Sequence, residues 1–311
     1  MSLRAKIHKP SEPLVFYEIV PPSVDDSSEM EDRLKLVGDV AGLVDVINIP
    51  EIRDELARGP RRGNFRQRIE PRVFAKAIHD RHSLETSVNR VTVHDSLDDQ
   101  RRWLKESAEV YGVRDLILVG GESVQFTYPG PSVSETAKLA NAEKLDLLLG
   151  GITIPSRPRE AERVLSKHKS GIEFFTTQVL LDAAPTVSLL RALDGVKAHL
   201  ILSFTPVSHP RDLTFLKWLG VGVPESLAIS VDQAPERESA AAASIELAKR
   251  ILQEVFSHLT PLSPAIGIQV ERITKRNSAA ALQMLIELAD FYPKLLRQTM
   301  SAMPVDTTQP K

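Results

Sequence analysis

The chain has 311 residues, of which 42% are hydrophobic, and a formal net charge of −2. This length and composition allow a large buried core, and the charge creates no basic field that would attract nucleic acid or an anionic membrane. The absence of cysteine excludes disulfides, thiolate catalysis and cysteine-ligated metal centres. There is no apolar run of membrane-spanning length and no secretory h-region, so we expect a cytoplasmic protein.

Apolar, β-rich runs alternate with amphipathic helical patterns along the whole chain. The predicted strands are Val15–Val20, Asp45–Ile49, Glu85–Val93, Asp115–Val119, Leu147–Ile154, Phe174–Leu181, His199–Phe204 and Ala265–Val270. The predicted helices are Ser28–Val40, Pro71–Arg81, Asp98–Tyr111, Ser132–Lys144, Arg159–Lys169, Pro185–Leu193, Ala240–His258 and Asn277–Tyr292.

This alternation matches the (β/α)8 TIM barrel, an α/β fold of about 250 residues plus insertions. A doubly wound sheet with a second domain is the alternative. We favour the barrel because no linker divides the chain and no G-x-G-x-x-G motif follows the first strand. We expect a barrel over residues 13–298, with an N-terminal extension over 1–12 and a flexible C-terminal tail over 299–311. Both ends lack periodicity and look loose.

The first predicted strand carries one carboxylate, within Phe16-Tyr17-Glu18-Ile19-Val20-Pro21-Pro22. The two prolines cannot continue a sheet ladder, so Glu18 lies close to the carboxyl end of this strand. Proteins with α/β folds place their chemistry at that end. Because burial raises the pKa of a carboxyl group, Glu18 is our candidate for a general acid.

Polar residues and glycines recur at the carboxyl ends of the later strands, where a barrel presents them to a ligand. In chain order they include Asn48, Arg90, Thr92, Gly120, Gly121, Glu122, Gln178, Asp182 and Glu271. The histidines show no H-x-x-x-H or H-E-x-x-H spacing, and we predict no metal site.

Several candidate residues have a structural interpretation as well as a functional one. Gly120-Gly121 either allows a ligand to approach the backbone closely or forms a plain turn. Tyr128, in a rigid turn, can stack on a ligand or donate a hydrogen bond. The Gln178 amide needs partners, which a ligand or a structural network could supply. Lys167 lies on a helix, where lysines are usually solvated.

Taken in order, these residues resemble the methylenetetrahydrofolate reductase family. The family's first strand has the pattern aromatic–Glu–two apolar residues–Pro–Pro, to which Phe16–Pro22 is similar. Gly171-Ile172-Glu173-Phe174-Phe175-Thr176-Thr177-Gln178, with Lys167 before it and Asp182 after it, resembles the family's Lys…Ala-Gly-Ala-x-Phe-x-x-Thr-Gln…Asp segment. Gly120 with Tyr128 resembles the family's flavin loop. The resemblance covers about residues 14–295.

The resemblance implies a barrel enzyme that reduces 5,10-methylenetetrahydrofolate to 5-methyltetrahydrofolate, with NAD(P)H as hydride donor and FAD as intermediate carrier. It implies that Glu18 protonates the folate nitrogen that leaves when the five-membered ring opens. The implied substrate-binding residues are Gln178, Asn48, Glu122 and Asp182. The implied cofactor-binding residues are Arg90, Thr92, Gly120, Gly121, Tyr128 and Lys167.

The chain departs from the family pattern on the flavin side. Where the family usually has Arg-Gly-Asp, this chain has Val119-Gly120-Gly121, and the next acid, Glu122, is displaced by one step. Arg90 stands in place of a flavin-contacting histidine, and a Tyr-Pro-Glu…His-Pro segment is shortened to Ile154–Pro158. The flavin site is therefore altered, weak or lost. If it is lost, direct hydride transfer from NAD(P)H to the folate iminium is the natural fallback.

Two other functions stay open. One is a folate-dependent demethylase or methyltransferase, although the absence of cysteine argues against the zinc-thiolate methyltransferases. The other is a non-catalytic, flavin-free subunit of a larger folate enzyme. We expect a tetrahydrofolate-type ligand, no nucleic-acid or membrane partner, and either a homo-oligomer or a partner subunit.

Overall fold

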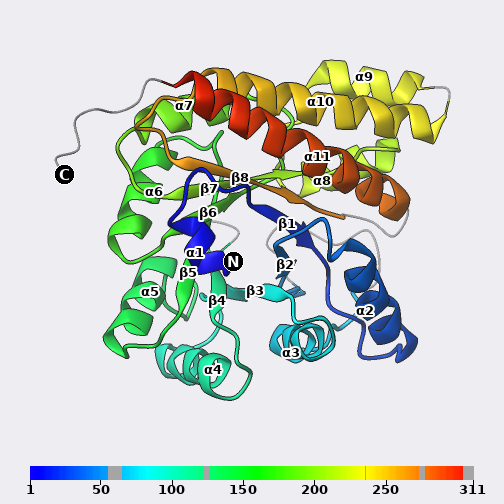
Figure 1. Ribbon diagram of the computed structural model, residues 1–311. Coiled ribbons are helices and arrows are strands. Elements are labelled where there is room, and N and C mark those ends of the chain that lie inside the picture. The colour runs from blue at the N-terminus through cyan, green and yellow to red at the C-terminus, as the bar shows by residue number, and fades with distance from the viewer. Residues whose placement is uncertain (55–64, 122–125, 235, 273–276, 304–311) are drawn as a thin grey trace.

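The computed structural model describes residues 1–54, 65–121, 126–234, 236–272 and 277–303. Its centre is a closed barrel of parallel strands in chain order, surrounded by helices (Figure 1), and this confirms the predicted (β/α)8 fold. The strands are β1 Val15–Glu18, β2 Val46–Ile49, β3 Glu85–Val91, β4 Asp115–Val119, β5 Leu148–Thr153, β6 Phe174–Thr177, β7 His199–Phe204 and β8 Ala265–Val270. The helices are α1 Leu3–Ile7, α2 Ser28–Val40, α3 Pro71–His82, α4 Leu97–Glu109, α5 Val133–Ala142, α6 Glu160–Lys169, α7 Ala184–Ala192, α8 Pro210–Trp218, α9 Glu225–Gln233, α10 Arg237–Ser257 and α11 Ser278–Ala302.

The strand register determines which side chains point into the barrel. Phe16 of β1 pairs with Val46 on one side and Gln269 on the other, so these side chains share one face of the sheet. Phe16 and Phe174 meet in the apolar interior, with 6.1 Å between their ring centroids. Because side chains alternate along a strand, Glu18 also points inward, above this apolar layer.

Helix α1 closes the amino end of the barrel. The loose terminus expected for residues 1–12 is not what the structure shows, because Leu3 and Ile7 are buried in the interior apolar cluster. The Leu3 N–H donates to the Glu85 carboxylate, and Lys6 Nζ donates to Asp45 Oδ1 at 2.6 Å. One apolar pair four residues apart is too short a periodic signal to predict such a helix.

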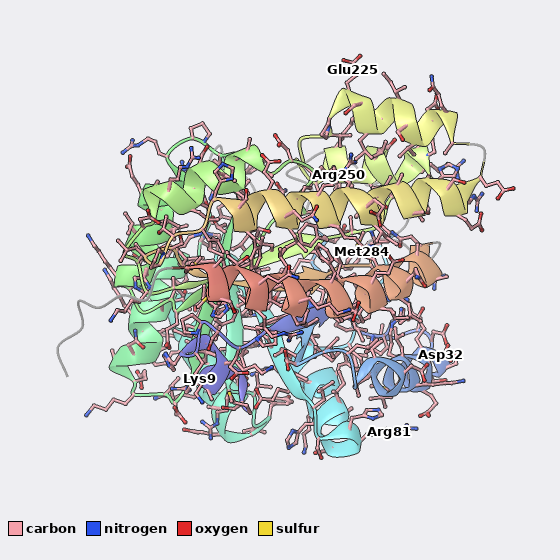
Figure 2. All side chains as sticks on the ribbon, turned by 45° about the horizontal axis from the view of Figure 1, so that its top comes forward. Lys9, Asp32, Arg81, Glu225, Arg250 and Met284 are labelled. Atoms are coloured by element: carbon pink, nitrogen blue, oxygen red, sulfur yellow. The ribbon has the colours of Figure 1, made fainter. Side chains whose placement is uncertain are left out.

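Two long helices, α10 and α11, lie side by side along one side of the barrel (Figures 1 and 2). Helix α11 was expected to end at Tyr292, but it continues through Pro293 to Ala302. The buried Tyr292 hydroxyl donates to the Ile266 carbonyl at 2.6 Å and accepts from the Leu14 N–H at 3.2 Å. These bonds tie α11 to β8 and to the segment before β1. Residues 304–311 of the expected tail lie outside the described residues.

Asp115, at the start of β4, is a partly buried acid at the amino end of the barrel. Burial is the main cause that raises the pKa of Asp115 to about 7. The negative charges of Glu85 and Asp146 act in the same direction, and Arg4 of α1 opposes them. Ionisation of Asp115 near neutral pH therefore works against folding.

Truncation of Leu3 tests the role of α1. Leu3→Ala removes a side chain that is 1% exposed, and we expect the free energy of unfolding in urea to fall by about 2 kcal/mol or more. Lys9→Ala, at an exposed residue just beyond α1, is the control and should change this free energy by less than about 0.5 kcal/mol. Equal stability of Leu3→Ala and the wild type would contradict the closure of the barrel by α1.

Asp115→Asn tests the raised pKa of this acid. Since the folded-state pKa lies above the unfolded value of about 4, the wild type loses at most about 1.4 kcal/mol of stability per pH unit between about pH 4 and pH 7. The variant lacks this loss, so its stability relative to the wild type should increase as the pH rises through this range. Thermal unfolding of both proteins at about pH 5 and about pH 8 measures the difference. Parallel pH profiles would show that Asp115 does not titrate there.

Candidate functional site

The candidate site surrounds Glu18 at the carboxyl end of the barrel. Glu18 pairs in register with Asn48 of β2, whose Nδ2 donates to Glu18 Oε2 at 3.4 Å. On the other side of β1, Tyr17 pairs with Val270, and this brings Glu271 beside Glu18. From the sequence, Glu271 is a polar residue at a strand end with no assigned role, although the spacing of Gln269 and Glu271 is the period of two that inward-facing residues show.

Glu18 and Glu271 form a pair of partly buried carboxyl groups. Burial raises the pKa of Glu18 well above its usual range, and the negative charge of Glu271 raises it further. Burial also raises the pKa of Glu271, whereas hydrogen bonds from Gln269 and Ser203 oppose that shift. Both shifts favour the protonated form of the pair, which is the form that a general acid needs.

Three buried amide oxygens of the barrel have no hydrogen-bond partner within the described part of the chain. They are Asn48 Oδ1, Asn89 Oδ1 and Gln269 Oε1. The strand register places their side chains on the inward face that Glu18 shares. Buried acceptors are normally satisfied, so these oxygens need donors from a ligand or from water.

Gln178 lines a cavity of about 340 Å³ beyond β6, and Asp182 lines the same cavity. Gln178 Nε2 donates to the Leu219 carbonyl at 2.8 Å. Leu219 follows α8. Helices α8 and α9 are an insertion between β7 and α10 that the sequence pattern did not predict. Asp182 is exposed, and its Oδ1 accepts from the Ala184 N–H at 3.1 Å at the start of α7. Two predicted substrate residues thus share one cavity, and a structural network holds the Gln178 amide.

Arg90 lies behind strand β3 and does not face the barrel mouth. Its buried guanidinium donates to Gln100 Oε1 at 2.9 Å and to Asp95 Oδ2 at 2.7 Å. It also donates to Glu51 Oε1 at 3.2 Å, and it lies 4.7 Å from the centroid of the Trp103 ring. These contacts fasten the ends of β2 and β3 to α4. They satisfy the buried guanidinium of Arg90 without a cofactor.

The segment after β4 carries Gly120, Gly121 and Tyr128. A Cβ at Gly121 would lie 2.3 Å from Cε2 of Tyr128, so the ring covers the backbone of this glycine. A Cβ at Gly120 would make only an ordinary contact. Tyr128 also meets His94 edge-on, at 5.4 Å between ring centroids. The ring therefore covers part of the backbone that was predicted to approach a flavin.

Lys167 and Thr92, two further predicted cofactor contacts, have partners inside the protein. Lys167 Nζ donates to the Ile152 carbonyl at 2.6 Å, and burial lowers the pKa of this lysine to about 8. Thr92 is buried, and its Oγ1 donates to the Val119 carbonyl at 3.4 Å. Glu122 lies outside the described residues. Arg90 and Lys167, the predicted cofactor cations, are thus both engaged within the fold.

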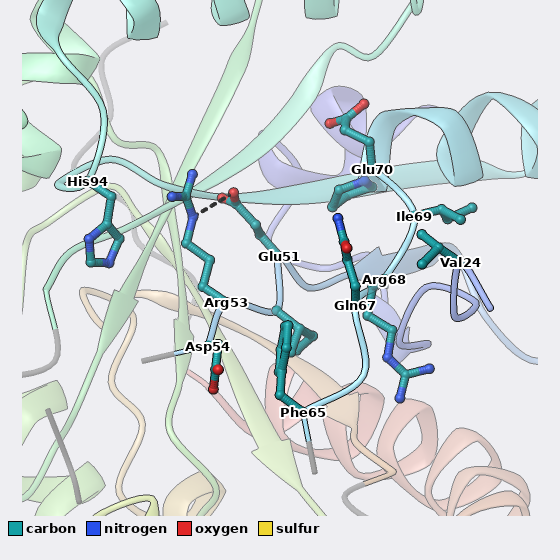
Figure 3. A pocket seen from close by; sticks show the side chains of 12 residues that line it. Val24, Glu51, Arg53, Asp54, Phe65, Gln67, Arg68, Ile69, Glu70 and His94 are labelled. Atoms are coloured by element: carbon teal, nitrogen blue, oxygen red, sulfur yellow. Dashed lines mark hydrogen bonds and ion pairs between the residues drawn. The ribbon is translucent and has the colours of Figure 1, made fainter. Parts of the chain in front are cut away.

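A larger cavity, of about 660 Å³, lies beyond β2 on the same end of the barrel (Figure 3). Arg53 and Glu51 point toward one another there, and Arg53 Nε donates to Glu51 Oε1 at 2.9 Å. Arg53 Nη2 also donates to Asp95 Oδ2 at 2.7 Å. Phe65 and His94 contribute rings to the lining. The volume lies within the range of small-molecule pockets.

Two properties of the described residues bear on the other predicted partners. None of their helices is long and apolar enough to cross a membrane. No group of three or more acidic, histidine or cysteine side chains among them is arranged to hold a metal ion.

No protein-family model matches the chain, and no curated protein matches it. Among solved structures, the chain is similar to an uncharacterized protein from Clostridium thermocellum that binds two copies of 5-methyl-5,6,7,8-tetrahydrofolic acid. The TM-score is 0.72, over 93% of this chain and 99% of that chain, at 19% sequence identity. At this identity the similarity shows a shared barrel fold.

Proposed function

We propose that this protein binds a reduced folate at the barrel mouth and reduces 5,10-methylenetetrahydrofolate to 5-methyltetrahydrofolate, with Glu18 as the general acid. The observation that carries the proposal is the pair of inward-facing carboxyl groups at the carboxyl end of the barrel, Glu18 and Glu271, whose pKa values burial raises. The ligand of the solved neighbour, a methylated tetrahydrofolate, supports the substrate class.

The polar lining of the barrel suits a pterin ring. A tetrahydropterin carries several N–H donors, and the amide oxygens of Asn48, Asn89 and Gln269 are buried acceptors that need donors. The cavity beside Gln178 is lined largely by apolar side chains and suits the p-aminobenzoyl group of a folate. We place the pterin over the barrel axis and the aromatic tail toward Gln178.

Glu18 acts on the nitrogen that leaves when the five-membered ring of the substrate opens. Its carboxyl proton passes to that nitrogen as the carbon–nitrogen bond breaks, and the lone pair of the other ring nitrogen forms the iminium. The hydrogen bond from Asn48 orients the Glu18 carboxyl group during this transfer. Hydride then adds to the iminium carbon and completes the methyl group.

NAD(P)H supplies the hydride when it is bound. We place its nucleotide part in the cavity of about 660 Å³, where the Phe65 ring can stack on a base. Arg53 also lines this cavity, but Glu51 and Asp95 hold its guanidinium. The residues predicted to hold FAD do not fit a flavin, because Arg90 and Lys167 are engaged elsewhere and Tyr128 covers Gly121. We therefore propose that the hydride passes directly from NAD(P)H to the folate.

Glu18→Gln tests the general acid. The variant keeps the shape of the side chain but cannot donate the proton, and general acid catalysis is typically worth about 10²–10⁴-fold in rate. We expect kcat to fall by about that factor in NAD(P)H oxidation with 5,10-methylenetetrahydrofolate, while 5-methyltetrahydrofolate still binds in calorimetry. Glu173→Gln, at a partly buried glutamate near the amino end of β6, is the control and should retain the wild-type rate. Wild-type turnover by Glu18→Gln in both directions would rule out the assignment.

A visible spectrum tests direct hydride transfer. Because the predicted flavin contacts are engaged elsewhere, we expect the purified protein to lack flavin absorption bands and yet to oxidise NAD(P)H when the folate substrate is added. Added FAD should leave this rate unchanged. A yellow protein whose activity rises with its flavin content would overturn direct transfer and restore FAD as the carrier.

A further inference from the structure

Three other carboxylates around the mouth of the barrel are each neutralised by an arginine. Glu29, at 4% exposure, accepts from Arg68 at 3.1 Å. Glu51 accepts from Arg53 at 2.9 Å and also from Arg90 at 3.2 Å. Glu160, at 3% exposure, accepts from Arg157 at 2.7 Å. Pairing of this kind is the usual way in which a protein tolerates a buried carboxylate.

Glu18 and Glu271 have no such cation among the residues that the structure describes. Arg272, the next residue after Glu271, is turned to the other side of the strand. Its Nη1 donates to Ser278 Oγ at 3.2 Å, and its charge acts on the buried Tyr17 hydroxyl behind β1. The negative charge that this pair carries is therefore available to a cationic ligand or intermediate.

The two carboxyl groups have different hydrogen-bond partners, and this difference indicates a different role for each. Glu271 Oε1 accepts from Gln269 Nε2 at 2.9 Å, and the Ser203 hydroxyl also lowers the pKa of this carboxyl group. Glu18 receives one weaker contact, from Asn48 at 3.4 Å. Hydrogen bonds to a carboxylate favour its ionised form. Of the two groups, Glu271 is therefore the one that ionises more readily, and Glu18 is the one that keeps its proton more readily.

We propose that Glu271 is a second catalytic carboxylate, which remains ionised and stabilises the cationic iminium that forms when Glu18 protonates the substrate. This inference rests on the proposed function. It places the anionic partner of the reaction on β8, whereas Val119-Gly120-Gly121 after β4 supplies no acid. Gln269 and Ser203 are then positioning residues that hold Glu271 in its ionised form.

The step balances in charge and atoms. The Glu18 proton moves to the leaving nitrogen, which keeps the electron pair of the broken carbon–nitrogen bond. The other ring nitrogen donates its lone pair to carbon and becomes positively charged, beside the Glu271 carboxylate. Hydride addition to that carbon returns the electron pair to nitrogen and removes the positive charge. Glu18 regains a proton from solvent, and Glu271 ends the cycle unchanged.

Glu271→Gln tests this role through two measurements. Loss of a preorganised charge at a transition state typically costs about 10²–10³-fold in kcat, and we expect a loss of that order. The variant also removes the negative charge that raises the pKa of Glu18. The alkaline limb of the kcat profile should therefore move to lower pH, by about one unit or more. A residue with a merely structural role would not move this limb.

Asp115→Asn is the matched control, because Asp115 is also an acid with a raised pKa but lies at the opposite end of the barrel. It should leave both kcat and the alkaline limb unchanged. Binding of 5-methyltetrahydrofolate, measured by calorimetry, shows that each variant is folded. Glu271→Asp, which keeps the charge, should recover part of the lost rate and return the alkaline limb toward the wild-type pH.

The outcomes separate the two proposals. A wild-type protein that forms no 5-methyltetrahydrofolate would overturn the proposed function and, with it, the inference. A wild-type protein that is active, with Glu271→Gln retaining its rate and its alkaline limb, would overturn only the role of Glu271. If the Glu271→Gln variant no longer binds 5-methyltetrahydrofolate, Gln269→Leu is used for the test in its place. This variant removes the hydrogen bond to Glu271 and should also lower kcat. Wild-type kcat in that variant would overturn the role.

Discussion

The register of β1 is the constraint on which the candidate site depends. This strand has only four residues, Val15–Glu18, and lies between β2 and β8 in the closed barrel. A slip of one residue would turn Glu18 away from the barrel interior and bring Tyr17 into it. Phe16, which meets Phe174 in the interior, and Tyr17, which is buried behind the strand, hold the register from both faces. The apolar layer therefore fixes the direction of the acid above it.

Local sequence patterns were sufficient to predict the barrel and the position of Glu18. Alternating strand and helix periods depend on burial of one face of each element, and this burial leaves its trace in the sequence. The end of β1 was predictable because Pro21-Pro22 cannot extend a ladder. Helices α1, α8 and α9 and the continuation of α11 beyond Pro293 were missed, since contacts with distant segments, such as that of Tyr292 with Ile266, stabilise them.

The direction of a side chain at a strand end was harder to predict than its position. Arg90 follows the inward-facing Asn89, so it points outward, to carboxylates that come from two other segments. Lys167 likewise finds its partner, the Ile152 carbonyl, on a neighbouring strand. A sequence motif predicts that both residues lie near the mouth of the barrel, but it does not show how the strands pair and so which way each side chain points. Glu271 shows the converse, because the sequence places it at a strand end but only the pairing of β8 with β1 brings it beside Glu18.

Burial of Glu18 and Glu271 without a compensating cation lowers the stability of the fold. The same fold neutralises Glu29, Glu51 and Glu160 with arginines. An arginine beside Glu18 would stabilise the folded protein, since it would offset the cost of burying charge. It would also lower the pKa of Glu18 below the range in which a general acid works, and it would repel a cationic intermediate. The proposed mechanism gives the absence of such a partner among the described residues a chemical reason. In that mechanism a neutral acid and a nearby anion are both needed at this end of the barrel, and loss of stability in return for such a need is the pattern expected of functional sites.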